Sequence, residues 1–384
     1  MLQKKKISFD ILDSIRGIAA LYVAIAHCRG VLWIGGREFM EKFPRNTWDI
    51  QDYFAFGSSM LTRLAVEFVI VFFVLSGFSI AHSLSGTKSV WEFYKRRFIR
   101  IYPSYVFALI WAGLIFVLTK YWFPEWYDGS FTGHGFLRTM EMKDYFEPGV
   151  IAKNLVYLPS QGFITPLWSL TYEVMFYLLA PFLLRRVNIY VYASLLLFLV
   201  NLIFPSAIDG LYLPRRLYDF LFVYNIYFAV GVFLYANFEK ILGWFTDYTK
   251  FEFILIVGGL LLFMYGANIY FQIETAFTFI EAAMLSCALI IFFLKYEIRI
   301  PPLMKIGQFS YSLYISHFPS IFLYLAIYWA IVHPTTPYIL NFFVWMPAVL
   351  FVVAIAWVHY QLIEKKTKKI LNLLRRQKPV ILTN

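Results

Sequence analysis

The chain has 384 residues, of which 60% are hydrophobic and 15% are charged. Soluble domains carry about 25% charged residues, so this composition excludes an ordinary soluble protein and favours lipid as the solvent. The formal charge of +11 is typical of nucleic-acid binding as well as of membrane proteins, but the long apolar runs favour membrane topology over nucleic acid.

Apolar segments long enough to cross a bilayer recur along the chain. A spanning helix needs about 20 mostly apolar residues, and about ten segments meet that length. They are residues 11–33, 62–84, 103–122, 166–184, 188–206, 218–238, 252–271, 275–294, 307–332 and 338–360. Most Lys and Arg residues then fall on one side of the membrane, which predicts that the N- and C-termini are both cytoplasmic. We therefore expect an all-α, polytopic membrane bundle of about ten transmembrane helices.

The first span, "FDILDSIRGIAALYVAIAHCRGVLW", carries ionisable residues among its apolar ones. Arg16 and His27 are eleven residues apart, almost three full turns, so they lie on one helix face about 16 Å apart along the axis. Ala20, Val23 and Ala24 leave room on that face between them. Either residue alone is explained by snorkelling to the membrane surface or by a bond to a neighbouring helix. The presence of both Arg16 and His27 on one helix face favours a functional role for the pair.

Three later segments also place polar residues in or beside spans. "KRRFIRIYP" puts Arg97 and Arg100 on one face at the cytoplasmic mouth of the third span. "PLWSLTYEVMFYLLAP" buries Glu173 in the fourth span, and "GQFSYSLYISHFP" forms the start of the ninth. The other polar and aromatic residues of the fourth span are Trp168, Ser169, Tyr172 and Tyr177. Those of the ninth span are Ser310, Tyr311, Tyr314 and His317. Interhelical hydrogen bonding is the alternative to function for the ninth span, including His317.

Residue counts from the span ends place His27 and Glu173 in the outer half of the bilayer, within about one turn of the same height. A histidine beside a carboxylate is a general base held in one tautomer. We therefore predict that these two side chains face a common cavity, which continues inward past Ala20 toward Arg16. Arg16 and the arginines at the mouth would hold an anionic donor that enters from the cytoplasm.

The segments between the spans divide the chain unevenly. Residues 34–61 and 123–165 form long outer loops rich in Trp, Tyr, Gly and Pro. Their rings are typical of an aromatic belt at the membrane surface, and a sugar-stacking surface is the alternative. We interpret residues 1–364 as one transmembrane domain. Residues 365–384 form a basic cytoplasmic tail, which we expect to be attracted to anionic inner-leaflet lipid and to have no catalytic role.

Six blocks of the sequence, taken in order, resemble those of the membrane acyltransferase-3 family over residues 9–365. They are "LDSIRGIAALYVAIAH", "FFVLSGF", "KRRFIRIYPSY", "PLWSLTYEVMFY", "GQFSYSLYISH" and "IEK". Members of that family include the O-acetyltransferases of lipopolysaccharide O-antigen, exopolysaccharide and peptidoglycan. The family motif Arg-x10-His falls on Arg16 and His27. Its Arg-x-x-Arg motif falls on Arg97 and Arg100, and its Trp-Ser-Leu-x-x-Glu motif falls on Trp168 to Glu173.

Two positions depart from the pattern of that family. Its acidic residue usually lies two positions before the first Phe of FFVLSGF, whereas Glu67 lies five positions before Phe72, so Glu67 is not carried over as a site residue. The final Glu of the family is often followed closely by Pro. Here Glu364 is followed by Lys365 and Lys366, so we expect the last helix to run on past this position.

The resemblance implies acetyl-CoA or another acyl-CoA as a co-substrate on the cytoplasmic side, and a carbohydrate or glycolipid as the acceptor. We therefore predict an integral-membrane O-acyltransferase, acetyl transfer in particular, in the bacterial inner membrane. Arg16, Arg97 and Arg100 would bind the CoA phosphates. His27 would be the general base, with Glu173 as its catalytic partner, and a covalent acyl-histidine is left open. Candidates for the acceptor contact or for oxyanion stabilisation are Trp168, Ser169, Tyr172, Tyr311, Tyr314 and His317.

A transporter or flippase for a glycolipid or a small anionic solute is the competing hypothesis, because buried Arg, His and Glu also suit a carrier. Two cysteines are too few for a disulfide framework or a zinc site. We expect no bound cofactor, no metal and no nucleic-acid partner, while membrane lipid is an expected partner. The oligomeric state is left open.

Overall fold

The computed structural model describes residues 8–33, 36–87, 89–127, 145–159, 162–210, 212–268, 275–332 and 342–376. Every element of regular structure in these ranges is a helix, which confirms the predicted all-α class. The longer helices are α1 (Leu12–Leu32), α3 (Ile50–Met60), α4 (Ala65–Ser85), α5 (Val90–Trp122), α8 (Trp168–Leu183), α9 (Val187–Ile203), α12 (Asn225–Ala236), α14 (Lys250–Gly266), α15 (Thr275–Lys295), α17 (Ser310–Val332), α18 (Trp345–His359) and α19 (Lys365–Arg376).

Short helices connect these elements. They are α2 (Gly36–Lys42), α7 (Pro148–Leu155), α10 (Pro205–Asp209), α11 (Arg215–Tyr218), α13 (Phe238–Trp244) and α16 (Pro301–Gln308). Two segments are π-helical, η6 (Asp219–Tyr224) before α12 and η9 (Tyr360–Glu364) after α18. Because α18, η9 and α19 follow one another without a gap, the last helix does run on past Glu364, as the sequence predicts.

Seven stretches within the described residues are long and apolar enough to cross a membrane. They are Ile50–Ser85, Val90–Trp122, Ile164–Ile203, Arg215–Ala236, Phe277–Lys295, Ser310–Val332 and Phe342–Leu373. The predicted count of ten is therefore not confirmed. Two predicted spans fall within Ile164–Ile203, and α14 has 17 residues. α1, a helix of 21 residues that carries Asp13, Arg16 and Arg29, is also absent from this set.

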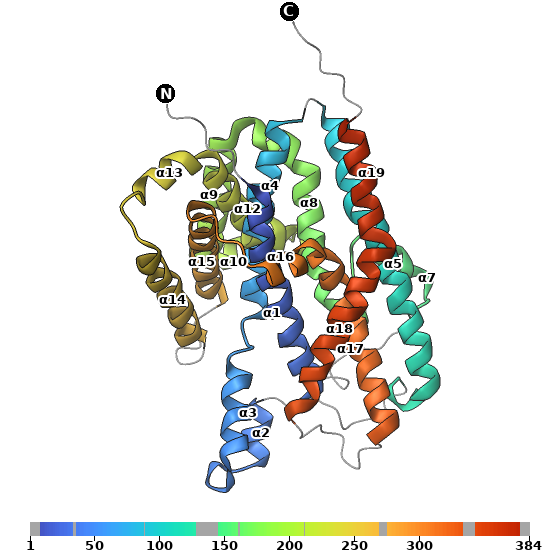
Figure 1. Ribbon diagram of the computed structural model, residues 1–384. Helices are drawn as coiled ribbons and strands as arrows, with labels where there is room; N and C mark the ends of the chain where they lie inside the picture. The colour runs from blue at the N-terminus through green and yellow to red at the C-terminus, as the bar shows by residue number, and fades with distance from the viewer. Residues whose placement is uncertain are drawn as a thin grey trace, which may run out of the picture.

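Helices α1, α4 and α17 form the centre of the bundle. α1 packs against α4, α16 and α17, and α17 also packs against α5 and α18 (Figure 1). Outward-facing apolar residues of the peripheral helices, including Ile110, Leu196, Leu262 and Leu350, are 62–75% exposed. Exposed apolar faces around a helical bundle are the surface that lipid covers. The chain is therefore built as a multi-pass membrane protein.

Two pairs of helices touch backbone to backbone through glycines. A Cβ atom added at Gly307 of α16 would lie 1.8 Å from the carbonyl oxygen of Asp13 in α1, and Gly17 of α1 is similarly close to α16. Gly77 of α4 and Gly231 of α12 make the same kind of contact. Small residues let helices approach closely in lipid, where packing takes the place of the hydrophobic effect. These contacts fix α1 and α4, which carry much of the site described below.

The beginning of α1 and the C-terminal end of α19 lie toward one end of the bundle, and α2 and α3 project from the opposite end (Figure 1). The first and last described helices thus meet at one end of the bundle (Figure 1), while the cytoplasmic location of the two termini stays a prediction. The last eight residues of the predicted tail, 377–384, lie outside the described residues. Phe39 and Ala55 of the first predicted outer loop form a small buried cluster with Trp33 at the end of α1 and Phe342 before α18.

Candidate functional site

A cavity of about 490 Å³ lies between α1, α4, α5 and α8. Four arginines line it: Arg16 from α1, and Arg96, Arg97 and Arg100 from α5. We call it the arginine cavity. The structure thus brings Arg16 together with the two arginines of the Arg-x-x-Arg motif, although more than 80 residues of chain separate them.

Two of these arginines are compensated by nearby acids. Arg16 donates hydrogen bonds to the Asp13 carboxylate at 2.8 Å and to the Ser79 hydroxyl at 2.8 Å. Arg96 forms an ion pair with Glu92 one turn earlier on α5. Arg16 is therefore held in a defined direction by α1 and α4 together.

The other two arginines have no ion pair among the described residues. The Arg97 guanidinium lies over the rings of Phe93 and Tyr177, 5.5 and 5.6 Å from their centroids. Its Nε atom is buried and has no hydrogen-bond partner in the described part of the chain. The Arg100 side chain is exposed at the mouth. Uncompensated guanidinium groups beside a cavity form a site for phosphate or another anion.

A smaller cavity of about 100 Å³ continues from the arginine cavity, since the two share Arg16, Phe72, Arg100, Glu173 and Tyr177 as lining residues. We call it the inner cavity. It extends to residues of α8 and of the first two turns of α17, namely Ser169, Ser310, Tyr311 and Tyr314. Six of the predicted site residues therefore meet there: Arg16, Arg100, Ser169, Glu173, Tyr311 and Tyr314.

The far wall of the inner cavity is a hydroxyl pair. The Ser169 and Tyr314 hydroxyl oxygens are 2.6 Å apart, and the Tyr314 hydroxyl donates to the Pro166 carbonyl at 2.7 Å. Since Tyr314 has one proton to donate, the Ser169 hydroxyl is the donor between the pair. Tyr311, one turn earlier, donates to the Ile101 carbonyl at 3.0 Å.

His27 and His317 form a hydrogen-bonded pair beyond that wall. Nδ1 of His27 lies 2.8 Å from Nε2 of His317, and Nδ1 of His317 lies 2.7 Å from the Tyr314 carbonyl oxygen. A carbonyl only accepts, so His317 carries its proton on Nδ1, and its Nε2 accepts in the neutral ring. His27 must then donate from Nδ1. Nε2 of His27 makes no hydrogen bond among the described residues, so its lone pair can accept one, and His27 is only half-buried.

The prediction that His27 and Glu173 face a common cavity does not agree with the two cavities described above. Glu173 accepts hydrogen bonds from Tyr177 and, at 3.2 Å, from Ser76, and it lines both cavities with Arg16. Neither cavity includes Ala20 or His27 in its lining, so the predicted continuous channel along α1 does not appear in them.

The error has a physical reason. The depth of Glu173 was counted from an outer end at residue 166, but Pro166 lies inside the bundle against Tyr314. Ser169 of α8 and Tyr314 of α17 are hydrogen-bonded, so they lie at the same height in the bundle. His317 lies three residues from this height toward the outer end of α17. Glu173 lies four residues from it in the opposite direction, toward the start of α17. The two side chains are therefore about 10 Å apart along the axis.

Trp168 and Tyr172 lie away from both cavities. Tyr172 donates to Asp219 at 2.8 Å and accepts from Arg216 at 3.2 Å, so its hydroxyl is engaged with η6 and α11. The Trp168 ring packs against Tyr224 with 5.2 Å between centroids. These contacts place both rings in an aromatic cluster beside η6.

Three cavity residues were not predicted from the sequence. Ser76, Ser79 and Ser83 of α4 line the arginine cavity together with Tyr177 of α8. The signal was available in "SGFSIAHS", because the three serines recur at intervals of three and four residues and so form one polar stripe on an apolar helix. Among the described residues, no group of three or more His, Cys, Asp or Glu side chains is arranged to hold a metal ion.

The fold and cavities define a class: a polytopic helical membrane protein with a basic cavity that leads to a hydroxyl pair and, beyond it, a histidine pair. The sequence model of the acyltransferase domain family, acyltransferase-3, matches residues 9–361, so the chain belongs to this family.

Two curated proteins show local similarity. Acyltransferase MdmB of Streptomyces mycarofaciens is 36% identical over 146 residues, which cover 36% of this chain and 34% of that protein. Protein 2 in the picA locus of Rhizobium radiobacter is 32% identical over 122 residues, which cover 30% of this chain and 50% of that protein. The matched segments thus span half or less of either relative. No solved structure matches the chain.

Proposed function

We propose that the protein is an O-acyltransferase of the bacterial inner membrane, which takes an acyl group, acetyl in particular, from cytoplasmic acyl-CoA and transfers it to a hydroxyl of a cell-envelope carbohydrate or glycolipid. The observation that carries the proposal is the arginine cavity of an acyltransferase-family fold, in which Arg97 and Arg100 have no ion-pair partner among the described residues. A cavity with free guanidinium groups suits a polyphosphate donor.

The donor would bind by its phosphates. Arg97 and Arg100 would make charge-assisted hydrogen bonds to them, and Arg16, already fixed by Asp13 and Ser79, would bind the end nearest the inner cavity. The pantetheine arm would enter the inner cavity. Its thioester would then reach the Ser169–Tyr314 hydroxyl pair, where the Ser169 hydroxyl would turn its proton from Tyr314 to the carbonyl oxygen as negative charge develops there.

The base would be His27. Its Nδ1 donates to His317, so the free Nε2 lone pair can accept the proton of an acceptor hydroxyl. The hydroxyl oxygen attacks the thioester carbonyl carbon and forms the new ester bond as the carbon–sulfur bond breaks. The CoA thiolate leaves and takes up the proton from His27, which returns the base to its neutral form. Glu173 lies about one helix turn closer to the arginine cavity than the hydroxyl pair does. It would therefore act on the donor side, beside the arginines.

The test uses purified protein in liposomes with labelled acetyl-CoA and an envelope carbohydrate extract. We expect release of CoA thiol together with label in the carbohydrate, and His27→Ala should lower the rate by about 10²–10⁴-fold. His359→Ala, which removes a buried imidazole from α18 away from both cavities, is the matched control and should stay within a few-fold of wild type. Solute transport without thiol release would contradict the proposal and support the transporter hypothesis.

A further inference from the structure

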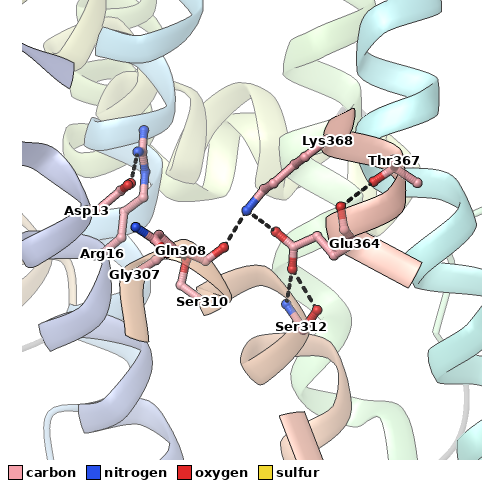
Figure 2. Close-up of polar contacts among 9 residues, drawn as sticks. All are labelled: Asp13, Arg16, Gly307, Gln308, Ser310, Ser312, Glu364, Thr367 and Lys368. Atoms are coloured by element: carbon pink, nitrogen blue, oxygen red, sulfur yellow. Dashed lines mark hydrogen bonds and ion pairs between the residues drawn. The ribbon is translucent and has the colours of Figure 1, made fainter. Parts of the chain in front are cut away.

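The break between α16 and α17 lies next to Arg16 (Figure 2), with the exposed residue Gln308 on one side and the buried start of α17 on the other. α16 ends at Gln308 and α17 begins at Ser310, with Phe309 between them. Each helix end leaves backbone groups without intrahelical partners, carbonyls at the end of α16 and amides at the start of α17. Such groups are costly away from water, so something else must satisfy them.

Two residues of the C-terminal helix satisfy both ends (Figure 2). Glu364 accepts from the Ser312 backbone N–H at 3.2 Å and from the Ser312 hydroxyl at 2.6 Å. Lys368 donates to the Gln308 carbonyl and pairs with Glu364 at 2.8 Å. We call Glu364 and Lys368 the double cap. Glu364 is only 4% exposed, so its charge depends on these partners.

The charges of the double cap match the two helix ends. A helix carries partial positive charge at its N-terminus and partial negative charge at its C-terminus. The Glu364 anion faces the start of α17, and the Lys368 cation faces the end of α16. One pair of oppositely charged residues, four positions apart on a single helix, therefore stabilises both halves of the break.

The break is in direct contact with the donor site. Gly307 precedes Gln308, and its backbone touches that of Asp13 so closely that no Cβ atom fits between them. The Asp13 carboxylate holds Arg16 at 2.8 Å, as Figure 2 also shows. On the other side of the break, the first turns of α17 supply Ser310, Tyr311 and Tyr314 to the inner cavity.

We propose that Glu364 and Lys368 are positioning residues of the acyl-donor site. They hold α16 against the Asp13–Arg16 turn of α1 and hold the start of α17 against the inner cavity, without touching the donor. The identity of the donor rests on the proposed function, whereas the mechanical coupling of the double cap to Arg16 does not. The short C-terminal helix thus contributes to the geometry of the site.

Two independent measurements test this coupling on the full chain in micelles. Hydrogen exchange reports the amides of residues 308–313 and of residues 13–17, and calorimetry with CoA reports donor affinity. Glu364→Gln and Lys368→Met should each speed exchange in both segments and weaken CoA binding by about tenfold or more, because each leaves its partner charge uncompensated. Transfer assays should show a raised KM for acyl-CoA with a smaller change in kcat.

Lys366→Met is the matched control, since Lys366 lies on the exposed face of the same helix and the substitution removes the same charge. It should leave exchange and affinity unchanged. Lys368→Arg keeps the cation and should restore most of the affinity, which guards against variants that simply misfold. The double variant Glu364→Gln/Lys368→Met should lose less than the sum of the single variants, because no unpaired charge remains.

The proposal is overturned if exchange rises at residues 308–313 while residues 13–17 and CoA affinity stay at wild-type values. The double cap would then stabilise the break alone. It is also overturned if neither segment responds to Glu364→Gln. A wild-type protein that does not bind CoA would refute the proposed function, but the exchange comparison between the two segments would still decide the coupling.

Discussion

Gly17→Ala should push α1 away from α16 and disturb Arg16, the neighbouring residue. The added Cβ would lie 2.1 Å from the carbonyl oxygen of Leu303, and ordinary contact begins at 3.4 Å, so the helices must separate by about 1.3 Å. Overpacking of this kind costs about 1–3 kcal/mol. Because Arg16 holds Asp13 and Ser79 at 2.8 Å each, a shift of that size breaks at least one of these hydrogen bonds.

The control is Gly30→Ala, the same change near the other end of α1, where a Cβ atom would have nothing within 4 Å. Alanine favours a helix over glycine by about 1 kcal/mol at both positions, so the difference between the variants isolates the clash. We expect reversible unfolding in mixed micelles to show Gly17→Ala as the less stable variant by about 1–3 kcal/mol, with weaker CoA binding by calorimetry. Equal stability of the two variants would refute the close contact between α1 and α16.

Three more outcomes follow from the site. Arg97→Ala and Arg100→Ala should each raise the KM for acyl-CoA by about 10- to 100-fold with less effect on kcat, while Lys95→Ala, exposed on the same helix, should not. His317→Ala should lower kcat by about tenfold, the worth of one hydrogen bond, and His317→Gln should recover part of this rate because its amide oxygen accepts from His27. Tyr172→Phe should leave transfer kinetics unchanged, since its hydroxyl bonds Asp219; a large loss would return Tyr172 to the site.

The sequence alone predicted the class of fold and the arginine end of the site. Periodicity placed Arg97 and Arg100 on one face, and both line the arginine cavity with Arg16. Their position at the end of an apolar run is a local property of the chain, which residue counting captures. The serine stripe of α4 was equally local and could have been found by the same count.

The pairings across helices were not local and were not found. The depth of Glu173 depended on where α8 begins, and that point is set by the contact of Pro166 with Tyr314, 148 residues further along the chain. The break between α16 and α17 is likewise stabilised by Glu364 and Lys368 from the C-terminal helix. In both cases a backbone feature in one segment is stabilised by side chains of another, and no window of sequence contains both partners.

Arg16 and His27 of α1 are tolerated in the bundle by different means, and the difference bears on their roles. Arg16 is neutralised by Asp13 on its own helix and is tied to α4 by Ser79, so its charge is fixed in place whether or not a ligand is bound. His27 donates a hydrogen bond to another neutral imidazole, that of His317, which brings no charge. A fixed cation suits the recognition of an anion, because recognition needs constant charge. A neutral ring with one nitrogen engaged and the other free suits proton transfer, because the free lone pair is kept in one orientation by the partner.

The second ring, His317, is itself oriented by the Tyr314 carbonyl, and the side chain of Tyr314 closes the inner cavity. A single residue of α17 thus connects the end of the donor cavity to the orientation of the base.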